Sequence, residues 1–221
     1  MGQPLPPSRK APLAPFGRRP FLICEIKRRS PSKGMIAEGL DARAQAAAYA
    51  AAGVRTVSVL TEEDYFGGSL ADLMAVKEKF PDISVLRKDF LLDEDDIEVS
   101  WRAGADAVLL IAGMLDAEQL RRMYAAALRL GMECLVEVHS KGDVEEVRSF
   151  APRFVGINSR NLQTFRVDML APMETAQFID WEAELVFESG IHSEEAAVTV
   201  LDAGFTGMLV GESVVRNPGL V

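Results

Sequence analysis

The chain has few of the residues that mark several common classes of protein. Among 221 residues there are only two cysteines and two histidines, and no apolar run is long enough to cross a membrane. Cys24 and Cys134 each lie inside an apolar segment, where a cysteine is typically a small buried residue rather than part of a disulfide or a metal site. Residues 1–20 are rich in proline and basic side chains and contain no signal peptide, so they predict a flexible arm. We therefore expect a cytoplasmic protein.

Basic residues are also in the minority. The chain has 24 lysines and arginines against 33 acidic residues, for a net charge of -9. This balance argues against a nucleic-acid partner, so the basic cluster RRSPSK is a local feature and any anion that it binds is small. No nucleotide-binding fingerprint of the G-x-x-x-x-G-K-[ST] type occurs. A hydrophobic content of 48% with 26% charged residues is ordinary for a globular protein with a sizeable core.

One pattern occurs four times along the chain. A helical segment rich in alanine or leucine ends at a glycine, and a buried strand follows within a few residues. The glycines are Gly53, Gly104, Gly131 and Gly204, separated by 51, 27 and 73 residues. These separations are close to two, one and three multiples of about 25 residues, the size of a helix plus a strand with short loops. The pattern indicates a βα repeat.

The repeat predicts eight strands and seven helices. The strands are expected over 21–27, 54–60, 83–88, 106–111, 133–138, 153–158, 184–188 and 207–211, and most are continuous runs of Val, Ile and Leu, as parallel strands covered on both faces should be. The helices are expected over 41–52, 69–79, 93–103, 116–130, 140–150, 168–180 and 193–203. Their predicted N-caps are Asp41, Ser69, Asp93, Asp116, Ser140, Asp168 and Ser193.

The position of the polar residues decides between an open sheet and a barrel. They follow the ends of nearly all the strands, whereas an open sheet gathers its ligand groups at one switch point. We therefore predict an α/β protein with a single-domain (β/α)8 TIM barrel over residues 21–221. The N-terminal extension is short, and only ESVVRNPGLV follows the last strand, so the last helix is expected to be reduced or missing.

The first predicted strand carries two charges near its end. Glu25 and Lys27 share one face of the strand, and burying either charge is costly unless it is paired or used. The turn that follows, Ser30–Gly34, combines serine, lysine and glycine in a form that suits an anion. A plain ion pair across the strand face is the alternative interpretation.

Two further strand ends supply acid–base groups. Lys88 ends the third strand, where a lysine at a barrel mouth can act as a general acid or balance a phosphate; a pair with Asp89 is the structural alternative. Glu137 ends the fifth strand and is a candidate general base, with a structural Glu–Lys pair as the alternative. His139, just beyond, is interpreted as a loop histidine.

The remaining strand ends point to binding groups. Asn158 and Arg160 follow the sixth strand and can bind a hydroxyl or an anion, although Asn158 alone can also cap a turn. Backbone N–H groups accumulate before helices in the loops after strands seven and eight, the usual phosphate site of a barrel. With Ser30, these loops predict a phosphate site made by Ser189, Gly190, Gly211 and Glu212.

An apolar wall is expected beside these polar groups. Phe66 and Phe90 lie just past strand ends, next to Gly67-Gly68 and Asp89, and are candidates for a ring-binding pocket. Leu109 and Ile111 are candidates for the same wall, and a position in the core fits them equally well.

The motifs occur together in the order of one family. The chain closely resembles indole-3-glycerol phosphate synthase of tryptophan biosynthesis in CEIKRRSPSKG, SVLTEEDYFGGSL, LRKDF, GADAVLLI, LVEVH, GINSRNL, ESGI and VGESVVRNP, which span residues 21–218. The resemblance implies a carboxy-lyase that converts 1-(2-carboxyphenylamino)-1-deoxyribulose 5-phosphate to indole-3-glycerol phosphate. The reaction comprises ring closure, decarboxylation and dehydration, and the resemblance implies that it needs no cofactor or metal.

The resemblance also implies roles for the residues. Lys88 would protonate the ketone oxygen as general acid, and Glu137 would assist loss of water as general base. Glu25, Lys27 and Asn158 would complete the polar floor, with Lys27 near the substrate carboxylate, and Arg160 would support Asn158 or the substrate. The phosphate would be held by Ser30, Ser189, Gly190, Gly211 and Glu212, and the apolar wall would take the anthranilate ring. Glu212 stands where many relatives have serine, so its backbone N–H would serve the phosphate.

Two alternative functions differ in class. One is another phosphate-binding barrel enzyme, such as the isomerase that precedes this step of the pathway, which would need its own acid–base pair. The other is a non-catalytic barrel that binds phosphate or a partner chain. We expect a monomer or weak homo-oligomer with a phosphorylated small-molecule substrate and neither a nucleic-acid nor a membrane partner.

Overall fold

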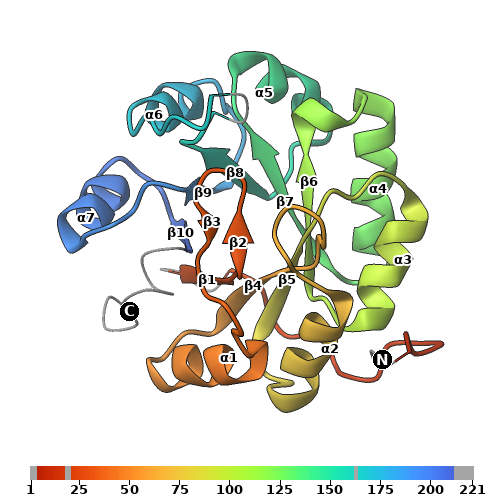
Figure 1. Cartoon of the computed structure of the whole chain (residues 1–221). Coiled ribbons are helices and arrows are strands. Elements are labelled where there is room, and N and C mark those ends of the chain that lie inside the picture. The colour runs from red at the N-terminus through yellow and green to blue at the C-terminus, as the bar shows by residue number, and fades with distance from the viewer. Residues whose placement is uncertain (1–3, 18–20, 162–163, 212–221) are drawn as a thin grey trace.

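Eight parallel strands form a closed barrel in the computed structural model, which describes residues 4–17, 21–161 and 164–211. The strands are β1 (Phe21–Ile26), β4 (Thr56–Leu60), β5 (Ser84–Lys88), β6 (Ala107–Ile111), β7 (Glu133–Val138), β8 (Phe154–Asn158), β9 (Glu184–Glu188) and β10 (Gly207–Val210). Their order around the barrel is β1-β10-β9-β8-β7-β6-β5-β4 (Figure 1). Because each strand pairs with its neighbour in sequence and β10 pairs with β1, the predicted (β/α)8 barrel is confirmed.

Within the part of the chain that the structure describes, seven helices surround the barrel. They are α1 (Ala42–Ala51), α2 (Leu70–Lys79), α3 (Glu94–Ala103), α4 (Ala117–Arg129), α5 (Lys141–Val147), α6 (Ala171–Ala176) and α7 (Glu194–Asp202), with short 3-10 turns η1 (Ala112–Met114) and η2 (Arg148–Phe150). Six predicted N-caps accept a backbone hydrogen bond in the first turn: Asp41, Ser69, Asp93, Asp116, Ser140 and Ser193. Of the helices within the described residues, none combines the length and the apolar character that crossing a bilayer requires.

The predicted start of the sixth helix at Asp168 is wrong. Helix α6 begins at Ala171, its N-cap is Leu170, and Pro172 lies in its first turn. Proline is favoured in the first turn because the N–H that it lacks would have no partner within the helix at that position. Asp168 instead accepts a hydrogen bond from the backbone N–H of Leu170, 2.9 Å away, and closes a turn before the helix. The prediction that the last helix is reduced or missing concerns residues 212–221, which lie outside the described residues.

A small hairpin lies over one end of the barrel. Strands β2 (Arg29–Ser30) and β3 (Gly34–Met35) are antiparallel and enclose the serine- and glycine-containing turn after β1. Figure 1 shows this hairpin in front of the strands, at the end of the barrel where β1 leads out. The sequence indicated a turn here but not the two short strands, because two residues are too few to show alternation.

The strands are buried on both faces, which explains their nearly continuous apolar sequence. Residues that point outward pack under the helices, and those that point inward form a separate cluster within the barrel. On three strands, the last inward-facing apolar residue is followed two positions later by a charged residue on the same face. Leu86 is followed on its face by Lys88, Leu135 by Glu137 and Val186 by Glu188. The alternation of the strands therefore aims these charges at the barrel axis.

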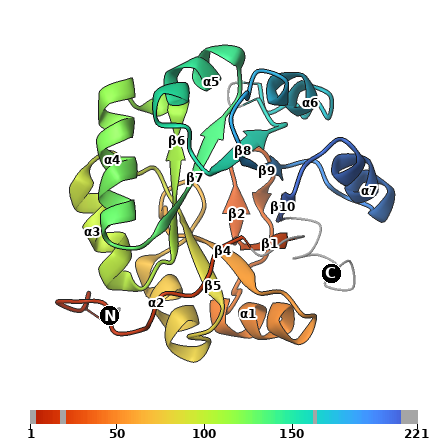
Figure 2. The ribbon, with the colours of Figure 1, turned by 180° about the vertical axis from the view of Figure 1, so that it is seen from behind.

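The described part of the N-terminal segment packs against the opposite end of the barrel. Phe16 is only 5% exposed, and its ring lies edge-on to Phe154 at 5.0 Å and to Phe21 at 5.8 Å between centroids. Arg102 donates a hydrogen bond to the carbonyl of Pro6 at 2.7 Å. Figure 2, the view from behind, shows the segment running from the N-terminus past α2 and β5 towards β1. Its composition predicted a loose arm, but residues 4–17 close the barrel floor.

A buried carboxylate fastens this segment. Asp106 precedes β6 and is fully buried, and its two oxygens accept from Arg9 Nη2 at 2.6 Å, Lys77 Nζ at 2.8 Å, and the backbone N–H groups of Ala14 at 2.9 Å and Val85 at 2.8 Å. Burial lowers the pKa of Lys77, although Asp106 opposes this effect. The carboxylate of Asp106 therefore links the N-terminal segment to α2 and β5.

We expect Asp106→Ala to lower the free energy of unfolding by about 3–5 kcal/mol, because it leaves the buried ammonium of Lys77 without its counter-ion. Urea unfolding followed by tryptophan fluorescence measures this loss. Glu118→Ala is the matched control, since Glu118 pairs with Arg122 at 2.8 Å on the exposed surface of α4. Equal losses in the two variants would contradict the role given to Asp106.

Candidate active site

A cavity of about 170 Å³ lies at the end of the barrel where the strands finish. All predicted site residues within the described chain line it: Glu25, Lys27, Ser30, Phe66, Lys88, Phe90, Leu109, Ile111, Glu137, Asn158, Arg160, Ser189, Gly190 and Gly211. Glu212 lies outside the described residues. Residues separated by up to 186 positions meet here because a barrel converges all its strand ends on one mouth.

Lys88 occupies the centre of the charged groups. Its Nζ lies 3.3 Å from Glu137 Oε2 and 3.3 Å from Glu188 Oε2, and 17% of its side chain is exposed. Burial disfavours the ammonium, but the carboxylates outweigh burial and raise the pKa of Lys88. Lys88 is therefore a fully protonated group between two acceptors. It does not pair with Asp89, which instead bonds to Arg87 at 2.8 Å.

Glu137 is held as an anion. Burial would raise its pKa, but Lys88, His139 and Asn158 together hold the pKa of Glu137 below its ordinary value. Asn158 Nδ2 donates to Oε1 at 2.9 Å, and His139 Nε2 lies 3.1 Å from the same oxygen. Burial also opposes the imidazolium, but Glu137 outweighs it and raises the pKa of His139. The charge on Glu137 is thus supported by neighbours from three elements.

Glu188 behaves in the opposite way. Burial, opposed by Lys88 and reinforced by the charge on Glu137, raises the pKa of Glu188 to about 7. Its Oε1 has no hydrogen-bond partner among the described residues, whereas Oε2 faces Lys88. One ammonium therefore lies between two carboxyl groups with different proton affinities, of which Glu137 is the ionised one and Glu188 the one that binds a proton near neutral pH.

The two charges at the end of β1 form an ion pair, which was the alternative interpretation of these residues. Lys27 Nζ donates to Glu25 Oε1, and both residues line the cavity. The backbone carbonyl of Glu25 accepts from the buried hydroxyl of Tyr49 at 3.0 Å, which ties this strand end to α1. Because the pair opens onto the cavity, Lys27 is a second cation available to an anionic ligand.

Two loops predicted to bind phosphate lie at the mouth and are tightly packed. Ser189 and Gly190 both have positive φ, +69° and +80°, so the chain turns sharply after β9. A Cβ built on Gly190 would lie 2.7 Å from Met169 Sδ, and one on Gly211 would lie 2.6 Å from Glu25 Oε1. Ser30 Oγ, on the hairpin, is 3.4 Å from Ser32 Oγ. Small residues are therefore required where these loops approach the cavity.

Arg160 is positioned through its backbone as well as its side chain. Its backbone N–H donates to Asn158 Oδ1 at 3.0 Å, while Nη1 donates to the carbonyl of Phe165 at 3.2 Å. Asn158 consequently bonds on one side to Glu137 and on the other to the loop after β8. The contact with Asn158 comes from the backbone of Arg160, and the role expected of its side chain stays a prediction.

Apolar side chains also line the cavity. The rings of Phe66 and Phe90 are 6.2 Å apart between centroids and inclined by 57°. Leu109 and Ile111 belong to the buried cluster inside the barrel and also line the cavity, so both interpretations of these residues hold. Phe165 and Leu209 extend the apolar surface. The cavity thus combines an apolar side with a charged floor.

Sequence reasoning missed two charged contacts. No role for Glu188 was predicted from the sequence, and His139 was interpreted as a loop residue. The signal for Glu188 was an inward-facing glutamate at the end of the apolar run LVFE, on a strand that pairs with Asn158. For His139 the backbone N–H bond to Asp143 at 2.7 Å turns the loop so that the ring meets Glu137, and no local pattern predicts this.

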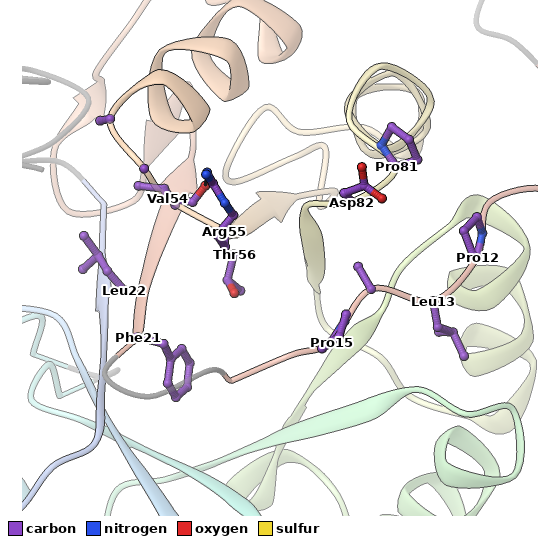
Figure 3. Close-up of a pocket in the computed structure, with 13 residues that line it drawn as sticks. Pro12, Leu13, Pro15, Phe21, Leu22, Val54, Arg55, Thr56, Pro81 and Asp82 are labelled. Carbon is purple, nitrogen blue, oxygen red and sulfur yellow. Dashed lines mark hydrogen bonds between the residues drawn. The ribbon is translucent and has the colours of Figure 1, made fainter.

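A second cavity lies at the other end of the barrel. It has a volume of about 690 Å³ and is lined by Pro12–Pro15, the start of β1, the turn before β4, and Pro81 and Asp82. Figure 3 shows Arg55 and Asp82 as its labelled charged residues, and Nη1 of Arg55 donates to the carbonyl of Val54 at 3.0 Å. It is larger than the mouth cavity, but it lacks the converging acid–base groups that chemistry requires.

The barrel and its charged mouth define a (β/α)8-barrel enzyme for a small anionic substrate. The family model described as "Indole-3-glycerol phosphate synthase" matches residues 8–220. Proteins of that name from Geobacillus thermodenitrificans and Geobacillus kaustophilus are 45% and 46% identical, over 97% of this chain and 85% and 84% of theirs. The chain belongs to the indole-3-glycerol phosphate synthase family. It is thus a carboxy-lyase of tryptophan biosynthesis, as the motifs predicted.

Solved structures with low sequence identity share the fold. 3-Hexulose-6-phosphate synthase from Salmonella typhimurium superposes with a TM-score of 0.71 at 16% identity, covering 89% of this chain and 90% of that one. N-Acetylmannosamine-6-phosphate 2-epimerase from Clostridium perfringens gives 0.67 at 13% identity, covering 91% and 90%. At these identities the likeness concerns the barrel alone.

The proton on Glu188 predicts a pH dependence of stability. Because its pKa is raised from 4.5 to about 7 in the folded state, the folded protein binds more protons in this window, and the contribution of Glu188 to stability is lost as pH rises through it. The glutamine of Glu188→Gln is neutral at every pH. The free energy of unfolding of this variant should therefore increase relative to that of wild type as the pH rises from 4.5 to 7.

Denaturant titrations across this pH range measure the difference. Glu146→Gln, on the exposed side of α5, is the control and should leave the pH dependence unchanged. A constant difference between Glu188→Gln and wild type would show that Glu188 titrates normally.

Proposed function

We propose that Lys88 and Glu137 are the general acid and general base of the indole-3-glycerol phosphate synthase reaction in this chain. The observation that carries the proposal is the position of the Lys88 ammonium, 3.3 Å from each of two carboxyl groups at the mouth of the barrel. Lys88 would protonate the ketone oxygen as the ring closes. Loss of CO2 and then of water completes the indole, and Glu137 would accept the proton in the dehydration.

The charges in the cavity support the assignment of Lys88 as the acid and Glu137 as the base. Glu137 is an anion, as a base must be, because its neighbours lower its pKa. Lys88 is fully protonated and therefore able to donate, and Glu188, with a pKa of about 7, can return a proton to it. The positive charge of Lys27 would balance a substrate anion that binds near it. Lys88, Glu188 and Glu137 would thus pass protons over short distances within one site.

The substrate would lie with its two ends in different surroundings. The anthranilate ring would rest against Phe66, Phe90, Leu109 and Ile111, with its carboxylate near Lys27. The phosphate would be held by Ser30 and the loops at Ser189, Gly190 and Gly211, together with the backbone of Glu212. Arg160, through Asn158, would keep the polar floor in position. This orientation places the ketone between the two ends, over Lys88.

We place the protein in the cytoplasm, as a monomer or weak homo-oligomer. Cys24 and Cys134 are free and buried, and burial raises the pKa of the Cys24 thiol to about 12. Free thiols in a biosynthetic enzyme suit a reducing compartment. Sedimentation of the purified protein at several concentrations tests the oligomeric state.

We expect Lys88→Met and Glu137→Gln each to lower kcat by about 10²–10⁴-fold, the loss typical of a positioned proton-transfer group. The measurement is the appearance of indole fluorescence after mixing with 1-(2-carboxyphenylamino)-1-deoxyribulose 5-phosphate. Circular dichroism should report a folded barrel in both variants.

Lys79→Met on α2 and Glu146→Gln on α5 are the matched controls, because both residues are exposed and away from the cavity. They should retain full turnover. Near-normal turnover in Lys88→Met or Glu137→Gln would refute the assigned roles, and a folded wild type without turnover would favour the non-catalytic barrel.

A further inference from the structure

A glycine inside the barrel faces the carboxyl group of Glu188. Gly156 lies on β8, two residues before Asn158, so both are on the inward face of the strand. A Cβ built on Gly156 would lie 2.1 Å from Glu188 Oε1 and 3.2 Å from its Cδ. The carboxyl group of Glu188 therefore occupies the space that any side chain at position 156 would need.

The backbone of Gly156 does not explain why glycine is present. Its φ is not among the positive values found in the described chain, so an alanine would adopt the same conformation. Glycine also weakens a strand because it has no side chain to pack. The reason for glycine at this position is consequently steric, and the atom it makes room for is an oxygen of a site residue.

The two oxygens of Glu188 are held by different means. Oε2 lies 3.3 Å from Lys88 Nζ, whereas Oε1 is buried and makes no hydrogen bond within the described residues. The close approach to Gly156 therefore limits where the Oε1 atom can lie. Without that space the carboxyl group would have to rotate or withdraw, and its distance to Lys88 would change.

We propose that Gly156 is a positioning residue, whose missing side chain forms a notch that seats the Glu188 carboxyl group against Lys88. The inference rests on the function proposed for Lys88 and Glu188. A side chain at position 156 displaces Glu188 without disturbing the fold, because the obstructing atoms are the far end of a flexible side chain. The nearest other atom, Leu135 Cδ1, would be 3.4 Å from the new Cβ, an ordinary contact distance.

The test compares Gly156→Ala with wild type, Glu188→Ala and the double variant. We expect Gly156→Ala to remain folded and to lose about 10²-fold in kcat, the lower end for loss of a positioned proton-transfer group. In the Glu188→Ala background the notch is empty, so adding Gly156→Ala should change kcat no further. Gly113→Ala is the matched control, since a Cβ there meets nothing within 4 Å.

A readout independent of turnover follows from the proton on Glu188. If the carboxyl group leaves its seat, its pKa falls towards the ordinary 4.5, and the loss of stability between pH 4.5 and 7 should disappear in Gly156→Ala. The groups that face Glu188 are Lys88 on β5, Glu137 on β7 with the neighbouring His139, and Glu25 on β1. All of them are unchanged in this variant.

Several outcomes would overturn the proposal. Full activity of Gly156→Ala would do so, and so would an equal loss of kcat in the presence and absence of Glu188. If Gly156→Ala does not fold, the double variant decides, because it must fold and match Glu188→Ala for the notch to hold. A wild type without turnover refutes the proposed function alone, and the pH dependence of Gly156→Ala then still tests the notch.

Discussion

The ammonium of Lys88 between the carboxyl groups of Glu137 and Glu188 is the interaction that the mouth of this barrel is built around. None of the three charges is tolerable alone at this depth, because an unpaired buried ion loses its hydration without compensation. They come from β5, β7 and β9, so they meet only when the sheet is closed and each strand has the register that turns its last inward residue to the axis. Closure of the barrel and assembly of the site are therefore one event.

The two ends of the barrel use buried charge for different purposes. At the floor, four donors satisfy Asp106, which is fully buried. At the mouth, Glu188 Oε1 is left without a hydrogen bond among the described residues, and Lys88 remains partly exposed. A fully satisfied cluster has nothing left to offer a ligand and contributes only stability. The incomplete cluster retains bonding capacity, which is what proton transfer to a substrate requires.

Glycine sets the geometry of this incomplete cluster. Gly156 leaves room for the carboxyl group of Glu188, and Gly211 leaves room for that of Glu25, whose Oε1 would lie 2.6 Å from a Cβ at position 211. Gly156 and Glu188 lie on the neighbouring strands β8 and β9, whereas Gly211 directly follows β10, the strand that pairs with β1. Strand interiors disfavour glycine, so Gly156 has a cost in the stability of β8 that the placement of the Glu188 carboxyl group offsets.

Local sequence determined most of the architecture. Apolar runs of four to six residues, N-caps such as Ser140, and glycines after helices indicate strands, helices and their order, because each signal depends on a few neighbouring residues. Polar residues such as Lys88 and Glu137 at strand ends indicated the mouth of a barrel for the same reason. The packing of Phe16 against Phe154, the four donors on Asp106 and the contact of Glu188 with Lys88 were decided only by the tertiary structure. Each of these joins residues far apart in the chain, so their energies arise only when the closed barrel brings the partners together.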